Sequence, residues 1–271
     1  ETKNAVLSAA KELGYSRNYS AFSLSTGESK LIALFLPRED IYVSLTQNPF
    51  YSELYSAFER KCRKEGYDVL IEPLMEQKEL SSWIKSRGID GAVILGLFPD
   101  NYHDEFSKNE IPLTLVDVYA SDEEYNIVRF DDYKGAYMST EHLIKNGHTN
   151  IGFICGNIDC SVVDRERYNG YRDAMIQNDL SFDKDNVIFC DATYDGGYQC
   201  FESIRNKKLT AVVCAADTIA IGVMRSFMDH GLELPDNLSI IGFDDIYTAK
   251  IVYPPLTTIK QDISYKGEMT A

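Results

Sequence analysis

The sequence predicts an α/β fold of two doubly wound, parallel-sheet lobes, similar to periplasmic binding proteins, with a helical remnant at the N-terminus. Short runs rich in valine, isoleucine and leucine alternate with amphipathic segments of helical length. This alternation runs through most of the chain and restarts near its midpoint. Continuous apolar strands between helices are typical of parallel sheets buried on both faces. Two such series indicate two similar lobes with a cleft between them, where ligands usually bind.

The N-terminal part begins with an expected amphipathic helix over residues 2–13, where Thr2 can cap the start and Gly14 can end it. Residues 16–26 are mostly polar and are expected to form a linker or short helix. The first strand is expected over residues 31–36. Further elements of the first series are helices at 50–64, 77–87 and 102–109 and strands at 67–71, 89–95, 113–118 and 127–130.

The same alternation then starts again, and the joint between the two series is expected near Asp131 and Asp132. A second crossing near residues 258–262 would return the chain to the first lobe. The second series has expected helices at 133–146, 165–178, 196–206 and 218–230 and strands at 150–155, 186–190, 211–214 and 238–243.

Composition narrows the possible partners of the chain. The 271 residues are 44% hydrophobic and carry a net charge of -15, whereas the first 30 residues are close to neutral. So acidic a body repels phosphate backbones, and any contact with nucleic acid is expected at the N-terminal end. No apolar run is long enough to span a bilayer and no secretory signal precedes Glu1, so we expect a cytoplasmic protein without a membrane partner.

Cysteine spacing and catalytic motifs give no sign of a metal site or an enzyme. The six cysteines fit no metal-binding spacing and are expected to be buried thiols in a reducing compartment. A nucleophile elbow, a phosphate-binding loop and an HExxH motif are all missing from the sequence, and its four histidines are scattered. We therefore expect no catalytic residues, no metal and no other cofactor.

Two side chains near the ends of expected βα units are the first candidates for ligand binding. Ligands of open parallel sheets bind just beyond the carboxyl ends of the strands. Arg167 can offer a planar fork of donors, and Asp244 can offer two acceptor oxygens. Opposed across a cleft, this pair suits a small polyhydroxylated or heteroaromatic ligand.

An ordered set of short motifs resembles the LacI/GalR family of transcriptional regulators. The set covers essentially the whole chain, and its order makes the resemblance specific. The matching stretches are Ala9–Leu24 (last head-domain helix and hinge), Asn48–Tyr51 (first pocket loop), His142–His148 (lobe-joining helix), Arg167–Tyr171 (ligand-arginine helix), Gly242–Asp245 and Pro254–Thr258.

The resemblance implies a division of the chain and a set of partners. Residues 1–29 would be a remnant of the DNA-binding head and hinge, 30–132 the N-terminal lobe, 133–259 the C-terminal lobe and 260–271 the return segment to the N-terminal lobe. The family's helix-turn-helix would precede Glu1, and its last helix and strand would follow Ala271. The full-length protein would then be a homodimer that binds operator DNA.

The resemblance also implies further ligand contacts beside Arg167 and Asp244. Phe50 and Tyr51 would open the first helix at the cleft edge, although either could instead be a hydrophobic staple on the core. Tyr194 aligns with an aromatic residue that stacks on the ligand, with an ordinary loop tyrosine as the alternative. Asp217, at the start of a helix, and Asp117, at the end of a strand, complete the candidate set.

Two further positions bear on the ligand and on DNA. Ala216 stands where many sugar-binding relatives have asparagine, which leaves a purine-like ligand as the second choice after a sugar. Leu24 matches the hinge leucine that family members insert into the DNA minor groove to unstack a base step, with Asn18 and Ala21 beside it in the hinge.

We therefore predict a ligand-responsive, DNA-binding transcriptional regulator, by resemblance a repressor, with a sugar as its effector. The alternative is a periplasmic solute-binding protein for a sugar, because the two classes share a fold. The hinge-like segment from Asn18 to Leu24 favours the regulator.

Overall fold

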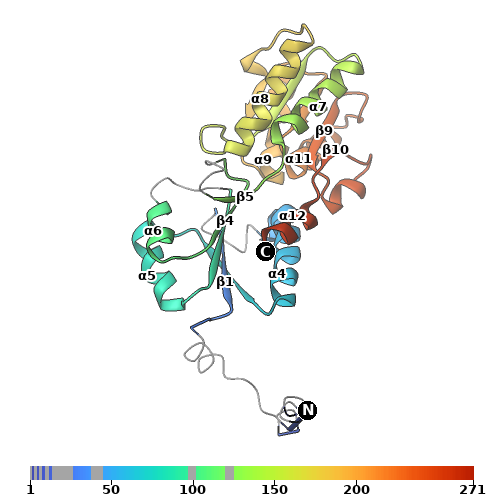
Figure 1. The fold of residues 1–271 in the computed structure, drawn as a ribbon. Coiled ribbons are helices and arrows are strands. Elements are labelled where there is room, and N and C mark those ends of the chain that lie inside the picture. The colour runs from blue at the N-terminus through green and yellow to red at the C-terminus, as the bar shows by residue number, and fades with distance from the viewer. Residues whose placement is uncertain are drawn as a thin grey trace.

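The structure is a computed structural model in which residues 27–37, 45–96, 102–119 and 125–271 are described, with isolated positions among the first 13. It consists of two lobes, each built on a parallel sheet (Figure 1). This confirms the predicted fold class. The predicted hinge residues Asn18, Ala21 and Leu24 lie outside the described residues.

The first lobe has, among the described residues, a five-stranded sheet in the order β2-β1-β3-β4-β5, and every neighbouring pair is parallel. Helices α5 and α6 lie on one side of this sheet and α4 and α12 on the other (Figure 1). The strands are β1 Leu31–Leu36, β2 Asp68–Pro73, β3 Gly91–Leu95, β4 Leu113–Val116 and β5 Asn126–Val128. The helices are α4 Pro49–Lys64, α5 Gln77–Arg87, α6 His103–Lys108 and α12 Ile263–Thr270.

The second lobe repeats the plan, with five strands among the described residues in the order β10-β9-β8-β6-β7, again all parallel. The strands are β6 Ile151–Cys155, β7 Val187–Phe189, β8 Ala211–Cys214, β9 Ser239–Asp244 and β10 Thr257–Lys260. The helices are α7 Asp132–Lys145, α8 Val162–Gln177, α9 Tyr194–Gln199, α10 Phe201–Asn206 and α11 Asp217–Asp229, with short 3₁₀ turns η2 Lys184–Asn186 and η3 Tyr247–Lys250.

Helix α8 begins three residues earlier than its predicted start at residue 165. The side chain of Ser161 accepts a hydrogen bond from the Asp164 N–H and so caps the helix at this point. Arg167 therefore lies in the second turn of α8. The segment predicted as one helix over 196–206 is two short helices, α9 and α10, which meet at Cys200.

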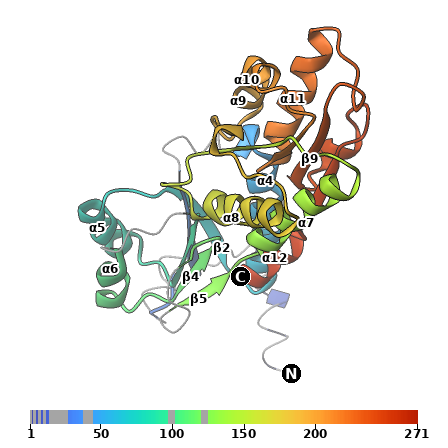
Figure 2. The ribbon, with the colours of Figure 1, turned by 90° about the horizontal axis from the view of Figure 1, so that it is seen from above.

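Helices α7 and α8 lie side by side in both views (Figures 1 and 2), and a glycine allows them to approach closely. A Cβ atom on Gly170 would lie 2.1 Å from the carbonyl oxygen of Tyr133, so no larger residue fits there without moving a helix. Asp132 is at the start of α7 and Arg167 is one turn before Gly170 in α8. The close crossing therefore brings these two side chains together.

The C-terminal segment crosses between the lobes after β10. Strand β10 pairs with β9 in the second sheet, and α12 then packs against α4 of the first lobe (Figure 1). A Cβ atom on Gly267 would lie 2.5 Å from the Leu54 carbonyl oxygen, which shows how closely α12 and α4 approach. The neighbouring residue, Lys266, is thereby buried between the lobes.

All six cysteines lie in the described part of the chain and are free thiols, four of them buried, Cys190 half-buried and Cys160 exposed. None of the helices within the described residues combines the length and the apolar character needed to cross a membrane.

Candidate ligand-binding cleft

A cleft of about 380 Å³ opens between the two lobes at the carboxyl ends of their strands. Five of the predicted site residues line it, three from the first lobe and two from the second. They are Phe50, Tyr51, Asp117, Arg167 and Asp244. The volume lies within the range of cavities that enclose small-molecule ligands, roughly 300–1,000 Å³.

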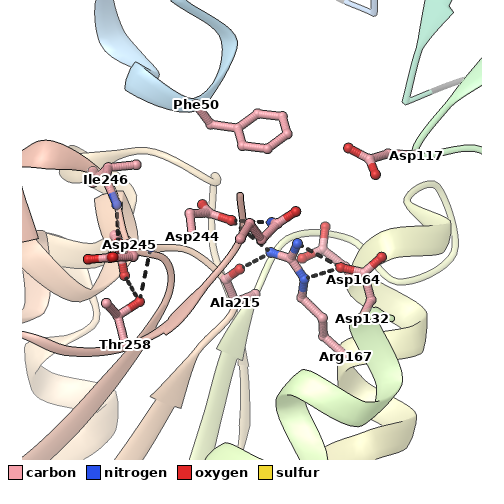
Figure 3. A network of polar contacts seen from close by, with 12 residues as sticks. Phe50, Asp117, Asp132, Asp164, Arg167, Ala215, Asp244, Asp245, Ile246 and Thr258 are labelled. Atoms are coloured by element: carbon pink, nitrogen blue, oxygen red, sulfur yellow. Dashed lines mark hydrogen bonds and ion pairs between the residues drawn. The ribbon is translucent and has the colours of Figure 1, made fainter. Parts of the chain in front are cut away.

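Arg167 is buried at the cleft wall and is held by Asp132 and by the backbone of Ala215 (Figure 3). Its Nε and Nη2 donate to Asp132 Oδ1 at 2.9 and 2.8 Å, and its Nη1 donates to the Ala215 carbonyl oxygen. The guanidinium carbon lies 3.7 Å from the centroid of the Phe243 ring, a cation–π contact. These contacts fix the plane of the guanidinium at the cleft wall.

The charge of Arg167 is secured by two carboxylates. Burial lowers the pKa of the guanidinium, but the attraction of Asp132 and Asp244 outweighs burial, and the net pKa lies above its ordinary value. Asp132 Oδ2 accepts a further hydrogen bond from the Tyr119 hydroxyl at 2.9 Å. Asp132 therefore fixes the position of Arg167 without itself lining the cleft.

Asp244 ends strand β9 and faces the cleft beside Arg167. Its backbone has φ 116° and that of Asp245 has φ 57°, both in the region that costs a non-glycine residue strain. Asp244 Oδ1 lies 3.8 Å from Arg167 Nη1 and accepts a hydrogen bond from Gln261 Nε2 at 2.6 Å. Burial raises the pKa of Asp244 to about 7 in spite of Arg167, so its charge changes near neutral pH.

Asp117 follows strand β4 on the opposite wall, and Lys266 neutralises it. Lys266 Nζ lies 2.6 Å from Asp117 Oδ1 and donates to Gln261 Oε1 at 2.9 Å. Burial raises the pKa of Asp117, and the attraction of Lys266 opposes that change. Gln261 therefore joins Asp117 and Lys266 of the first lobe to Asp244 and Arg167 of the second.

Phe50 and Tyr51 combine the two roles that the sequence left open. Asn48 caps α4 by accepting from the Phe50 N–H at 3.1 Å, and Pro49 occupies the first helical position. The Phe50 ring packs against the core at 9% exposure and meets the Tyr51 ring edge-on at 5.6 Å. Both residues also line the cleft, so the start of α4 forms an aromatic wall.

Asp217 does not line the cleft, and this corrects its place in the candidate set. It is fully buried, and its two oxygens accept from the Ile246 N–H at 2.9 Å and from Thr258 Oγ1 at 2.6 Å. A Cβ atom on Gly242 would lie 2.1 Å from Asp217 Oδ1. Asp217 therefore ties the start of α11 to the loop after β9, and burial raises its pKa to about 6.

Tyr194 also lies outside the cleft. Thr193 caps α9 by accepting from the Gly196 N–H, and Tyr194 follows as the first helical residue. The residue is 42% exposed, and its ring packs beside that of Tyr198, with centroids 6.3 Å apart. The cleft is lined instead by Ala192, two residues earlier. We therefore remove Tyr194 from the candidate set.

The structure adds residues that the sequence analysis missed. Asp132 and Gln261 were not singled out, and Asp132 had no signal beyond its place at the joint. Lys266 had none either, because the buried face of α12 holds one large apolar residue, Ile263, whereas Tyr265 and Met269 of the same helix are exposed. In the described part of the chain, no group of three or more His, Cys, Asp or Glu side chains is arranged to hold a metal ion.

Comparison with known proteins gives consistent matches. A periplasmic-binding-protein-like domain matches residues 140–271. The HTH-type transcriptional repressor PurR of Actinobacillus pleuropneumoniae serotype 3 is 30% identical over 98% of this chain and 79% of the relative. PurR of Haemophilus influenzae is 30% identical over 96% of this chain and 77% of the relative.

Two solved structures are similar over most of the chain. The transcriptional regulator CelR in complex with cellobiose has a TM-score of 0.81 and 25% identity, covering 100% of this chain and 82% of that one. A LacI family regulator from Enterococcus faecium with bound ribose has a TM-score of 0.78 and 26% identity, covering 89% of this chain and 87% of that one.

Proposed function

Because this chain belongs to the LacI/GalR family of ligand-responsive, DNA-binding transcriptional regulators, we propose that it binds a small sugar in the cleft between its lobes. The observation that carries the proposal is the buried pair of Arg167 and Asp244, 3.8 Å apart at the cleft wall. A sugar hydroxyl both donates and accepts hydrogen bonds. A guanidinium donor beside a carboxylate acceptor therefore suits two neighbouring hydroxyl groups.

The opposite wall suits the other surface of a sugar. The C–H faces of sugar rings pack on aromatic side chains, and the rings of Phe50 and Tyr51 border the cleft on the first-lobe side. The relatives in complex with cellobiose and ribose support this class of effector. A purine-like ligand stays the second choice, because Ala216 in the second-lobe wall offers no side-chain hydrogen bond to a sugar.

Effector binding would act by changing the balance between lobe arrangements. A ligand that contacts both walls favours the closed arrangement, and it shifts the balance only by its difference in affinity for the two states. In the full-length protein this change would reach operator DNA through the hinge, where Leu24 as a minor-groove wedge stays a prediction. Two heads on a homodimer would read a near-palindromic operator.

A thermal-shift panel tests the proposal. The panel contains cellobiose, ribose, common neutral mono- and disaccharides, and the nucleobases guanine and hypoxanthine. We expect one neutral sugar to raise the melting temperature, because a ligand at 100 times its Kd stabilises the native state by about 2.7 kcal/mol.

Two variants locate the response. Asp244→Asn removes the charged acceptor and should abolish the shift, whereas Tyr194→Ala, outside the cleft, should preserve it. A full shift in Asp244→Asn would contradict the site. A nucleobase that raises the melting temperature when no sugar does would contradict the effector class.

A further inference from the structure

Among the described residues, negatively charged side chains outnumber cations around the cleft. Four carboxylates line it and a fifth stands behind Arg167, whereas the only cations that pair with any of these carboxylates, among the described residues, are Arg167 and Lys266. The five carboxylates belong to Asp117, Asp132, Asp164, Asp191 and Asp244. Two of the lining carboxylates, Asp164 and Asp191, have no salt-bridge partner in the described part of the chain.

Both cations are already committed to partners within the protein. Arg167 donates to Asp132 and to the Ala215 carbonyl oxygen, and it lies beside Asp244. Lys266 is 6% exposed and is held by Asp117 and Gln261. A phosphate or carboxylate on a ligand would have to compete with these buried partners for either charge.

Two helix N-termini at the cleft are also occupied, and the third, that of α11, has Ala216 as an N-cap without a side-chain hydrogen bond but carries the acid Asp217 in its first turn. At the start of α8, Ser161 caps the Asp164 N–H, and the Asp164 carboxylate lies in the first turn and accepts from the Gly156 N–H at 3.4 Å. The positive end of this helix is therefore offset by its own acid. At the start of α4, Pro49 has no N–H and the Phe50 N–H is bonded to Asn48.

We infer that the effector carries no negative charge: the cleft accepts a neutral or amine-bearing sugar and rejects its phosphorylated or carboxylated forms. The inference rests on the proposed function of the cleft as a sugar site. An anion entering there meets unpaired carboxylates in a partly desolvated space, where like charges repel more strongly than in bulk water. Hydroxyl and ammonium groups, in contrast, donate hydrogen bonds that carboxylates accept.

Isothermal titration calorimetry on charge-matched compounds tests this inference. The series are glucose, glucosamine, glucuronate and glucose 6-phosphate; ribose and ribose 5-phosphate; and, as a non-sugar series, adenosine and its monophosphate. Within the series that binds, we expect the anionic member to bind at least about tenfold more weakly than the neutral one. An anionic member that binds as tightly or more tightly would overturn the inference and leave the proposed sugar site standing.

A double variant separates charge from size. Asp164→Asn with Asp191→Asn removes the two unpaired carboxylates at nearly constant volume and should narrow the neutral-to-anion affinity ratio several-fold. Asp236→Asn, an exposed loop acid in the same lobe, should keep the wild-type ratio. An unchanged ratio in the double variant means exclusion by size and overturns the inference.

The series also separates the two claims. Binding of adenosine but of no sugar would refute the sugar effector. The comparison of adenosine with its monophosphate would then test whether the cleft rejects negatively charged ligands. A panel in which no compound binds contradicts both.

Discussion

The two walls of the cleft differ in how they hold their polar groups. On the second-lobe wall, Arg167 and Asp244 are buried side by side, and Asp132 fixes the arginine from behind. On the first-lobe wall, the aromatic pair at the start of α4 borders the cleft, and Asp117 is bound to Lys266. The second lobe therefore provides directional hydrogen bonds and the first provides a flat apolar surface. We expect recognition to depend mainly on the second lobe and closure on the first.

The largest loss of stability should come from removing the buried cation of the second-lobe wall. Arg167→Ala leaves two buried carboxylates without their cation, and removing one partner of a buried ion pair typically costs about 3–5 kcal/mol. Urea denaturation at pH 7 should show this loss, together with loss of effector binding. Arg172→Ala in the same helix is the control, because its more exposed ion pair with Asp173 should contribute less than about 1 kcal/mol. Equal losses in the two variants would contradict the account.

Breaking the first-lobe wall should cost less, because its carboxyl group can take up a proton. Lys266→Met keeps the apolar stem but leaves Asp117 without a cation, which raises the pKa of Asp117 further above its unfolded value. A group with a raised folded pKa destabilises the protein as pH rises through that pKa. We expect a loss of about 2 kcal/mol at pH 8 that shrinks at pH 5, measured by urea denaturation. A loss that is the same at both pH values would count against the ion pair.

The aromatic surface should contribute to affinity rather than to specificity. Phe50→Leu preserves most of the core volume but removes the ring, and we expect the Kd for a bound sugar to rise about three- to tenfold. The same variant should leave the preference between neutral and anionic sugars unchanged, as measured by calorimetry. A change of that preference without a change of affinity would contradict the division of roles between the walls.

The smallest effect concerns pH. Because burial raises the pKa of Asp244 to about 7, its carboxylate is more fully charged at pH 8 than at pH 6, and effector affinity should increase severalfold over that interval. The sign for stability is opposite. The folded protein holds this proton to higher pH than the unfolded chain, so stability of the free protein falls as pH rises from about 4 to about 7.

Asp244→Asn should remove most of this slope, measured by thermal unfolding between pH 5 and pH 8. The pH dependence of stability that comes from Asp217, with a pKa of about 6, should remain. A pH profile of stability that is identical in Asp244→Asn and the wild type would contradict the raised pKa.

The sequence could predict those cleft residues whose position is set by the end of a strand. Asp117 and Asp244 stand at or just after the ends of buried strands, and in a parallel sheet those ends share one edge. Tyr194 does not line the cleft, and its ring packs beside Tyr198 of the same helix. Asp217 does not line the cleft either, and the sequence could not show this because its partners, Ile246 and Thr258, are distant in sequence and meet it only in the folded lobe.

Local sequence patterns could not predict the polar contacts that link the two lobes. Gln261 bonds to Asp244, 17 residues earlier, and Lys266 bonds to Asp117, 149 residues earlier. Such pairs follow from the crossing of the chain back to the first lobe and from the close contact of α12 with α4.

The most direct test is a crystal structure of the chain with the neutral sugar that gives the largest thermal shift. We predict density for the sugar between the lobes, with hydroxyl oxygens within hydrogen-bonding distance of Arg167 and Asp244 and one ring face on Phe50. A sugar bound on the outer surface of either lobe, or in the cleft without contact to Arg167 and Asp244, would contradict the account.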